Sequence, residues 1–298
     1  MSTCGSWEWK GKSHVVRTFH KTAPSGEGNA IRFSNDGTLL AVGHPLDTPE
    51  NGFALVSIYD SRSGALIHQI AEPKGAGGEM TIAFSPDGKS LIRTVNHSNR
   101  PGDYVVVDSV DSWAGQWGLQ TLPLIPRSLA VSPDGHFAVI GGQVYGPGPR
   151  YVLTPQIAIL NLDTHQIVRT INNVFPDENQ VQTLAWSADG VSIAAGCIVD
   201  GSFRGPNAVR LFDSATGNEI LNEGAENAFV SGLTFTSDNK YVIEGQVDGA
   251  IRIWDRPHRS LLQKIPVNIH ARTILSVSRD SRYLAVGNGS NISIWELH

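Results

Sequence analysis

The sequence predicts an all-β fold built from repeated four-stranded units, and three observations lead to this prediction. A turn of the form Ser-x-Asp recurs about every 50 residues along the chain. Short apolar runs that alternate with polar residues flank these turns, which is the pattern of half-buried strands. No stretch shows a helical period of useful length. A repeat of this length with four strands per unit indicates the blade of a β-propeller.

The clearest copy runs from Leu233 to Asp255 and shows why each element forms. Its strands are rich in aromatic and β-branched residues, which favour a pleated surface. Ser, Asp and Asn favour the first turn, and an Asp-Gly pair favours a tight hairpin. The predicted elements are strand Leu233–Phe235, turn Ser237–Lys240, strand Tyr241–Ile243, hairpin Val247–Gly249 and strand Ile251–Trp254.

Six copies of this unit predict six blades of four strands each. The Ser-x-Asp turns, with Thr in place of Ser in the fifth copy, lie at about residues 34–36, 85–87, 132–134, 187–189, 236–238 and 278–280. The remaining third strands are predicted at Val56–Asp60, Tyr104–Asp108, Ile157–Leu160, Val209–Asp213 and Ile292–Trp295. A fourth apolar run follows most of them.

The residues Ser237–Asp255 (SDNKYVIEGQVDGAIRIWD) resemble a WD40 repeat. The Ser-Pro-Asp-Gly sequences at Ser85 and Ser132 resemble the turn between its first two strands, and the match covers roughly residues 30 to 298. The repeats are degenerate, because the usual Gly-His pair is missing, with His270 as its one candidate remnant. Trp ends the third strand in two copies only, and the other copies have Tyr59, Val107, Leu160 and Phe212 there. The resemblance implies a rigid platform that binds a protein or peptide.

The ends of the chain are predicted to complete one blade together. The last copy stops at His298, just after its third strand, and Val15–Phe19 is a short apolar strand near the N-terminus. Pairing of Val15–Phe19 beside Ile292–Trp295 would close the sixth blade and remove exposed edges. Residues 1–12 are then an N-terminal edge segment of a single domain, residues 1–298. Trp7–Trp9 leaves a different closure open, and seven blades are the less favoured alternative.

Composition narrows the class of protein. The chain has 298 residues, 40% of them apolar and 17% charged, and a net charge of −5. This charge does not favour nucleic acid or an anionic membrane as a partner. No apolar stretch reaches 18 residues, and no signal peptide is visible. Cys4 and Cys197 do not make a disulfide framework. These features suggest a cytoplasmic protein, although a mature secreted form fits the same residues.

The connections between the second and third strands are the first candidate for a binding surface. They are tight in copies five and six, whereas the first four copies carry insertions stiffened by Pro and Gly: His44–Gly52, Asn96–Asp103, Gln143–Arg150 and Ile198–Pro206. In a propeller all of them leave from one face, and loops on a rigid scaffold often carry binding residues. Neutral insertion is the alternative. The candidate binding residues are Tyr145, Arg150, Tyr151, Phe203, Arg204, His44, His97 and Arg100.

A second candidate set lies just before each first strand, where propeller blades converge on their axis. These polar residues are predicted to line the mouth of a central channel, and a solvated channel with Arg–Glu pairs is the alternative. They are Asn29, Glu79, Arg127, Gln182, Ser231 and Arg272.

Sequence motifs for chemistry are weak. His44, Asp47 and Glu50 lack a metal-ligand spacing, so no metal and no cofactor is predicted. A Gly-x-Ser-x-Gly nucleophile elbow is absent from the sequence. The leading hypothesis is a non-catalytic platform for a protein or peptide partner, as a whole protein or as a domain of a larger one. The alternative is a small-molecule site or an enzyme in the funnel at the channel mouth, with His44, His97, Glu79 and Arg127 as candidates.

Overall fold

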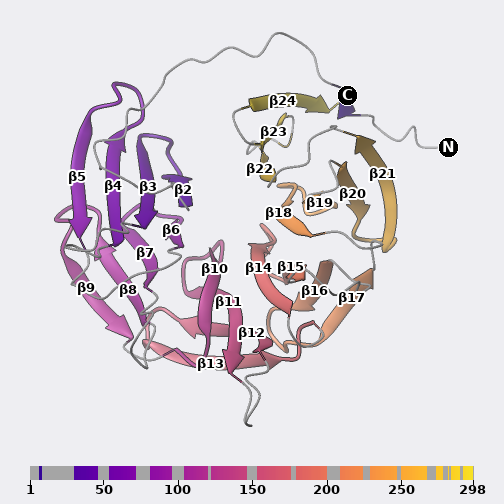
Figure 1. Ribbon diagram of the computed structural model, residues 1–298, viewed down its shortest axis with the longest axis horizontal. Helices are drawn as coiled ribbons and strands as arrows, with labels where there is room; N and C mark the ends of the chain where they lie inside the picture. The colour runs from indigo at the N-terminus through magenta and orange to yellow at the C-terminus, as the bar shows by residue number, and fades with distance from the viewer. Residues whose placement is uncertain are drawn as a thin grey trace. The chain divides into compact units, whose positions relative to one another are not determined.

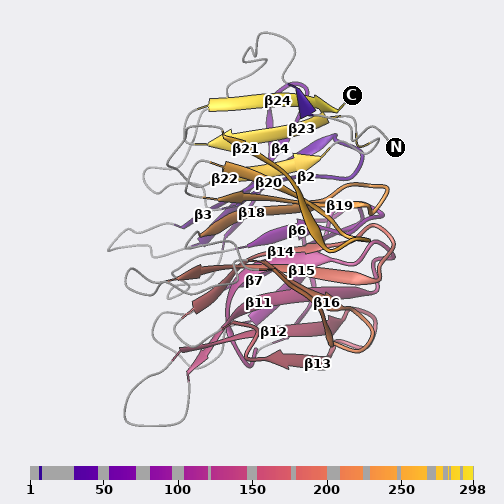
Figure 2. The ribbon, with the colours of Figure 1, turned by 90° about the vertical axis from the view of Figure 1, so that its right-hand side faces the viewer.

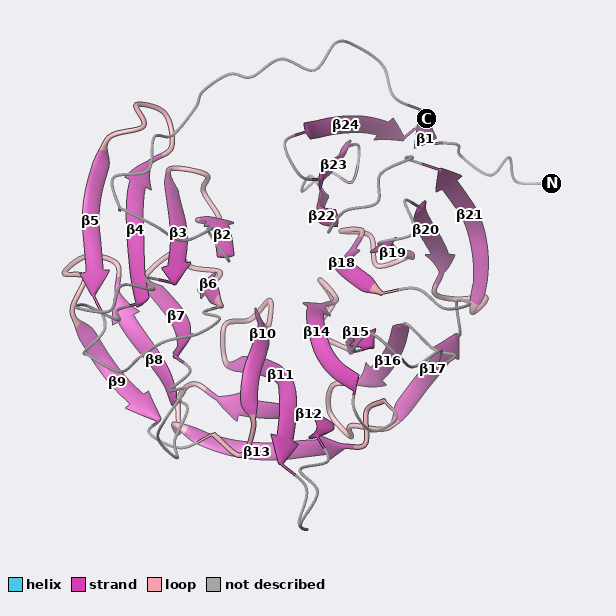
Figure 3. Ribbon diagram, viewed as in Figure 1, coloured by secondary structure: helices cyan, strands magenta, loops and turns pink. Residues whose placement is uncertain are grey.

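The computed structural model describes the chain in segments: residues 7–8, 30–45, 54–71, 81–95, 104–119, 122–145, 153–175, 179–199, 209–223, 229–246, 250–266, 273–277, 281, 283–288 and 291–297. The regular elements of these segments are strands (Figure 3). They form six four-stranded antiparallel sheets, numbered here as sheets 1 to 6 in chain order (Figure 1). The prediction of an all-β fold made of four-stranded antiparallel sheets is therefore confirmed.

The first three sheets follow the chain in simple order. Sheet 1 contains β2 (Ala30–Phe33), β3 (Leu39–Pro45), β4 (Ala54–Asp60) and β5 (Leu66–Ala71). Sheet 2 contains β6 (Ile82–Phe84), β7 (Ser90–Val95), β8 (Tyr104–Ser109) and β9 (Gly115–Leu119). Sheet 3 contains β10 (Ile125–Val131), β11 (Phe137–Tyr145), β12 (Leu153–Asn161) and β13 (Gln166–Asn172).

The next two sheets repeat this order, and the last one includes the N-terminal strand. Sheet 4 contains β14 (Asn179–Trp186), β15 (Ser192–Val199), β16 (Val209–Asp213) and β17 (Glu219–Glu223). Sheet 5 contains β18 (Val230–Phe235), β19 (Tyr241–Gln246), β20 (Ala250–Asp255) and β21 (Ser260–Pro266). Sheet 6 contains β22 (Thr273–Val277), β23 (Tyr283–Asn288), β24 (Asn291–Leu297) and β1 (Trp7–Glu8), and β22 to β24 lie side by side in Figure 2.

An N-terminal strand completes sheet 6 as predicted, but it is formed by a different segment from the predicted one. The segment that pairs with β24 is Trp7–Glu8, with Trp7 opposite Leu297 and Glu8 opposite Glu296. The predicted segment, Val15–Phe19, lies outside the described residues. Val15–Phe19 is a short apolar run, and Trp7–Glu8 begins the alternating segment Trp7–Trp9. Either one suits an edge strand, so the pattern alone did not decide between them.

The chain divides into two compact units. The N-terminal unit comprises residues 15–147 and 156–170, with sheets 1 and 2 and most of sheet 3. The C-terminal unit comprises residues 1–14, 148–155 and 171–298, with sheets 4, 5 and 6. The expectation of a single domain over residues 1–298 stays a prediction.

Within each unit, neighbouring sheets bury apolar side chains against each other. In the N-terminal unit, Ile58 of sheet 1 and Ile82 of sheet 2 share one buried cluster, and Val107 of sheet 2 and Leu160 of sheet 3 share another. In the C-terminal unit, sheets 4 and 5 share a cluster that includes Trp254. A sheet that is apolar on both faces cannot be stable alone, so each one is stabilised by its neighbours.

The Ser-x-Asp turns hold the first two strands of sheets 1 to 5 together. In sheet 3 the Ser132 hydroxyl donates to Asp134 Oδ1 at 2.5 Å and accepts the N–H of Phe137 at 2.9 Å. Asp134 Oδ1 also accepts the N–H of His136 at 3.0 Å. Equivalent bonds close the turns that begin at Ser34, Ser85, Ser187 and Thr236. The sixth predicted turn, residues 278–280, lies outside the described residues.

The residue after the turn aspartate has a left-handed backbone. Gly135 has φ 79°, and Asn239 has φ 61° at the equivalent place. Glycine and asparagine reach this conformation at little cost, which explains why the Ser-x-Asp-Gly sequence recurs. The sequence motif is therefore a local structural device.

In sheets 1 to 5 the third strand carries a buried side chain near its end, and sheet 2 departs from the pattern. Trp254 of sheet 5 lies opposite Val242, and Phe212 of sheet 4 lies opposite Ile193. In sheet 2 the corresponding pair is Asp108 opposite Leu91, so Asp108 takes this position rather than Val107. The sequence alignment placed Val107 there because it matched Asp108 to the aspartate of the WD40 repeat. Register pairing corrects that assignment by one residue.

Candidate functional site

The predicted loop-face residues are only partly described. His44 lies in β3 opposite Leu55, and Tyr145 is the last residue of β11. The other candidates, Arg150, Tyr151, Phe203, Arg204, His97 and Arg100, lie outside the described residues. His44 and Tyr145 both stand at the strand ends from which second-to-third connections leave.

In neighbouring sheets of one unit, these strand ends lie on the same side. In the N-terminal unit, Asn35 Nδ2 in the first Ser-x-Asp turn donates to the carbonyl of Pro86 in the second at 2.8 Å. In the C-terminal unit, Asp189 N donates to Asn239 Oδ1 at 3.1 Å across two such turns. Because the turns meet at one end of neighbouring sheets, the second-to-third connections leave together from the opposite end.

Three of the predicted channel-mouth residues occupy one equivalent backbone position. Arg127, Gln182 and Ser231 are each the extra residue at a register shift between the first and second strands. All three side chains are half-buried. A β-bulge re-aims the side chain at its extra residue, so the shared position indicates a common direction relative to each sheet. Asn29, Glu79 and Arg272 lie outside the described residues.

In sheet 4, Gly196 lies on the strand opposite the bulge and has no room for a larger side chain. A Cβ atom on Gly196 would lie 2.6 Å from Val230 Cγ1 and 2.7 Å from Thr183 Cγ2. Both distances are shorter than van der Waals contact, so the glycine permits sheets 4 and 5 to approach. This position is structural.

Charged residues occupy equivalent buried positions in two of the sheets. Arg93 of β7 and Glu244 of β19 each lie opposite the residue three places before the turn Ser or Thr. Arg93 Nε lies 2.6 Å from Asp108 Oδ2, with side chains only 7% and 2% exposed. Glu244 Oε1 accepts a 2.6 Å hydrogen bond from Gln246 Nε2 and lies 3.8 Å from Arg252 Nε. Each charge is therefore compensated inside the protein.

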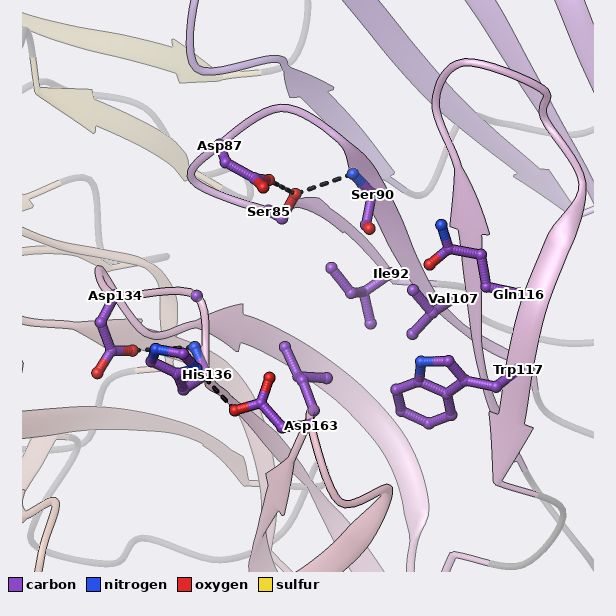
Figure 4. A pocket seen from close by; sticks show the side chains of 12 residues that line it. Ser85, Asp87, Ser90, Ile92, Val107, Gln116, Trp117, Asp134, His136 and Asp163 are labelled. Atoms are coloured by element: carbon purple, nitrogen blue, oxygen red, sulfur yellow. Dashed lines mark hydrogen bonds and ion pairs between the residues drawn. The ribbon is translucent and has the colours of Figure 1, made fainter.

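A cavity of about 290 Å³ lies between sheets 2 and 3, at the end that carries the Ser-x-Asp turns (Figure 4). It belongs to the N-terminal unit and is on the opposite end of the sheets from the predicted loop face. Two Ser-x-Asp turns, an aromatic side chain and an apolar base line it. The lining residues are Ser85, Asp87, Ser90, Ile92, Val107, Gln116, Trp117, Asp134, Gly135, His136, Leu162 and Asp163.

The turn carboxylates in this cavity are held in the ionised form. The hydrogen bond from the Ser85 hydroxyl is the main cause that lowers the pKa of Asp87. Burial acts to raise the pKa of Asp134, but hydrogen bonds from Ser132 and from the N–H of His136 outweigh it, and the pKa is lowered. With Asp163 as a third carboxylate, the cavity favours a cationic ligand over an anionic one.

His136 and Asp163 form an exposed pair at the edge of the cavity. His136 Nδ1 lies 2.7 Å from Asp163 Oδ2, and the two side chains are 58% and 62% exposed. A carboxylate that orients a histidine is part of many nucleophilic sites, but such a site also needs a nucleophile in contact with the ring. Ser85, a buried serine in the cavity lining, instead donates its hydroxyl to Asp87. The pair therefore does not by itself make an active site.

Trp117 forms an aromatic wall of the cavity and is held in place from outside. The ring of His165 stacks on it, with centroids 4.0 Å apart and planes at 17°. His165 has φ 59°, a backbone conformation that costs a non-glycine residue about 1–2 kcal/mol. The stack joins the outer strand of sheet 2 to the last turn of sheet 3.

Sequence reasoning missed this cavity, although part of its signal was visible. The turn serines and aspartates were recognised as turn-forming residues, and the structure confirms that role for the five described turns. The carboxylates of Asp87 and Asp134 line a cavity only because sheet 3 packs beside sheet 2. No motif in either copy encodes that packing.

Within the described ranges, no group of three His, Cys, Asp or Glu side chains is arranged to hold a metal ion. Those same ranges contain no helix that is long and apolar enough to span a membrane.

Comparison with known proteins supports the fold and is silent on activity. The sequence matches no protein-family model and no curated protein. Among solved structures, a chain of Kuenenia stuttgartiensis hydrazine synthase is similar, with a TM-score of 0.70 and 18% sequence identity. The match covers 95% of this chain and 80% of that chain. At this level of identity the similarity is one of fold, an all-β repeat architecture consistent with a propeller.

Proposed function

We propose that the six sheets are the blades of a WD40-like β-propeller that acts as a non-catalytic interaction platform. Its partner is a protein or peptide, bound at the strand ends from which the second-to-third connections leave. The observation that carries this proposal is the shared direction of neighbouring sheets, given by the turn-to-turn hydrogen bonds of Asn35 and Asp189.

The distribution of connection lengths supports this end of the sheets. β19 ends at Gln246 and β20 begins at Ala250, and β23 and β24 are separated only by residues 289–290. In contrast, residues 46–53, 96–103, 146–152 and 200–208 separate the second and third strands of sheets 1 to 4. The first two of these longer connections, residues 46–53 and 96–103, follow one another in the N-terminal unit. Long loops on a rigid scaffold are common sites of recognition.

The chemistry of the described residues also favours binding over catalysis. The recurring aspartates accept hydrogen bonds within their own turns, and the pKa values of Asp36, Asp87, Asp134 and Asp189 are lowered. A general acid or base requires a pKa shifted toward neutrality, which is the opposite direction. These residues therefore serve the scaffold.

A peptide-display selection against the purified protein tests the proposal. A selected peptide should lose at least tenfold in affinity, about 1.4 kcal/mol, when Tyr145→Ala and Arg204→Ala are combined. Arg62→Ala is the matched control, because Arg62 is exposed at a turn on the opposite end of sheet 1 and should leave affinity unchanged. If the double variant binds the peptide as tightly as the natural sequence, the partner does not bind at this end of the sheets. A metabolite that raises the melting temperature by several degrees, with no peptide selected, would favour the small-molecule alternative.

A further inference from the structure

The C-terminal unit contains a guanidinium that bridges two neighbouring sheets at the turn end. Arg256 follows β20 of sheet 5 and reaches sheet 4, where its Nη1 donates to Asp189 Oδ2 at 2.9 Å. Its Nη2 donates to Ser192 Oγ at 2.8 Å, and Nη1 also lies 3.3 Å from the carbonyl oxygen of Asn239. Three acceptors, a carboxylate, a hydroxyl and a backbone carbonyl, thus form a guanidinium cradle.

The cavity between sheets 2 and 3 has the same three acceptors in equivalent places. Asp87 is the turn aspartate of sheet 2, as Asp189 is of sheet 4. Ser90 follows its turn serine by five residues and donates its N–H to that serine, as Ser192 does. Gly135 has the left-handed conformation that Asn239 has.

The cavity differs from the Arg256 cradle in the residue at the position of the arginine. Leu162 N donates to His136 O at 2.8 Å, and Arg256 N donates to Lys240 O at 2.9 Å. These equivalent bonds place Leu162 at the backbone position of Arg256. A leucine side chain carries no donor, so it cannot satisfy the three acceptors as Arg256 does.

The acceptors of the cavity make no corresponding bond within the described chain. Asp87 Oδ1 accepts hydrogen bonds from the Ser85 hydroxyl and from the N–H of Lys89. Asp87 Oδ2 accepts no hydrogen bond from the described residues. The side-chain oxygen of Ser90 and the carbonyl oxygen of Gly135 also accept no hydrogen bond from another described residue. Lys89 is exposed and its charge helps to lower the pKa of Asp87, but the two side chains form no ion pair. Asp87, Ser90 and Gly135 all line the cavity, and Figure 4 shows the side chains of Asp87 and Ser90.

The remaining lining suits an arginine side chain. Asp134 and Asp163 add negative charge, and Ile92 and Val107 give an apolar base for an aliphatic stem (Figure 4). Trp117 adds an aromatic wall, as Phe235 does beside Arg256, whose guanidinium carbon lies 6.0 Å from the Phe235 ring centre. The volume of about 290 Å³ is near the lower end for a ligand pocket, which fits one side chain better than a large molecule.

We propose that the cavity between sheets 2 and 3 binds a guanidinium group on an aliphatic stem, presented as an arginine side chain of a peptide. The bound group donates to Asp87 Oδ2, Ser90 Oγ and Gly135 O, in the arrangement that Arg256 has in the other unit. This site is on the opposite end of the sheets from the proposed partner face and does not depend on it.

Titration with short blocked peptides tests the proposal directly. The probe is acetyl-Gly-Arg-Gly-amide, followed by calorimetry or by chemical-shift changes, with citrulline and lysine versions as comparisons. Citrulline keeps the shape of arginine without its charge, so its peptide should bind at least tenfold more weakly. Butylguanidine, a free guanidinium on a short alkyl stem, distinguishes the two sources of the group: weaker binding than the arginine peptide indicates a peptide ligand.

Leu162 gives a matched pair of variants. Leu162→Arg should fill the cavity from within, as Arg256 does, and should reduce binding of the arginine peptide at least tenfold without lowering the melting temperature. Leu162→Met keeps an uncharged side chain of similar volume and should bind like the natural sequence. Equal binding of arginine and citrulline peptides, unchanged binding by Leu162→Arg, or no saturable binding of any guanidinium probe would each overturn the proposal.

Discussion

Removal of Arg93 should destabilise the protein strongly, because it leaves the Asp108 carboxylate buried without its counter-charge. The two side chains are 7% and 2% exposed, and Arg93 donates to both carboxylate oxygens, at 2.6 and 3.3 Å. Breaking a buried pair from one side costs about 3–5 kcal/mol. We expect Arg93→Met to lose this amount of unfolding free energy.

The stability of Arg93→Met is compared with that of a double variant that removes both charges. Tyr59, Phe212 and Trp254 occupy in sheets 1, 4 and 5 the position that Asp108 has in sheet 2, so the architecture accepts an apolar side chain there. Arg93→Met combined with Asp108→Leu should therefore be considerably more stable than Arg93→Met alone. The difference measures the desolvation of an unpaired charge rather than lost packing.

Urea denaturation followed by fluorescence and circular dichroism measures these differences. Lys240→Met is a matched control, because Lys240 lies 3.7 Å from Asp238 with both side chains well exposed, and such pairs contribute about 0–1 kcal/mol. A loss below about 1 kcal/mol for Arg93→Met, or a double variant no more stable than the single one, would refute the reasoning.

Two further predictions concern titratable groups. The pKa of Asp87 is lower in the folded chain, chiefly because of the Ser85 hydroxyl, so the unfolded chain binds protons first as the pH falls below about 4. The unfolding free energy should fall with pH in that range, and Ser85→Ala should weaken the dependence; a pH-independent urea midpoint would contradict this. Burial raises the pKa of the Cys197 thiol to about 12. In a Cys4→Ser background, Cys197 should react with a disulfide reagent at pH 8 only after unfolding, and rapid reaction of the native protein would show that the thiol is accessible.

The turns were predictable because their chemistry is contained in a few consecutive residues. Ser132, Asp134 and Gly135 form their hydrogen bonds and left-handed backbone within one turn, and the sequence shows all of these preferences. Arg127 was predicted to lie just before a first strand, but it lies within β10, and its role as a bulge residue emerged only from the pairing of β10 with β11.

Contacts between sheets could not be predicted in the same way. The segment that completes sheet 6 is Trp7–Glu8, and nearly the whole chain separates it from its partner strand. An alternating pattern shows that a segment can form a strand, but it does not show which edge the strand joins.

The sequence by itself determined the repeated strands, their turns and the all-β class, because period-2 alternation and turn chemistry act over a few residues. Only the tertiary structure decided that Asp108 pairs with Arg93 and that Leu162 stands where the other unit has Arg256. Those outcomes depend on the register between strands and on the packing of one sheet against the next. They join residues that are distant in the sequence, and no local pattern encodes their distance or direction.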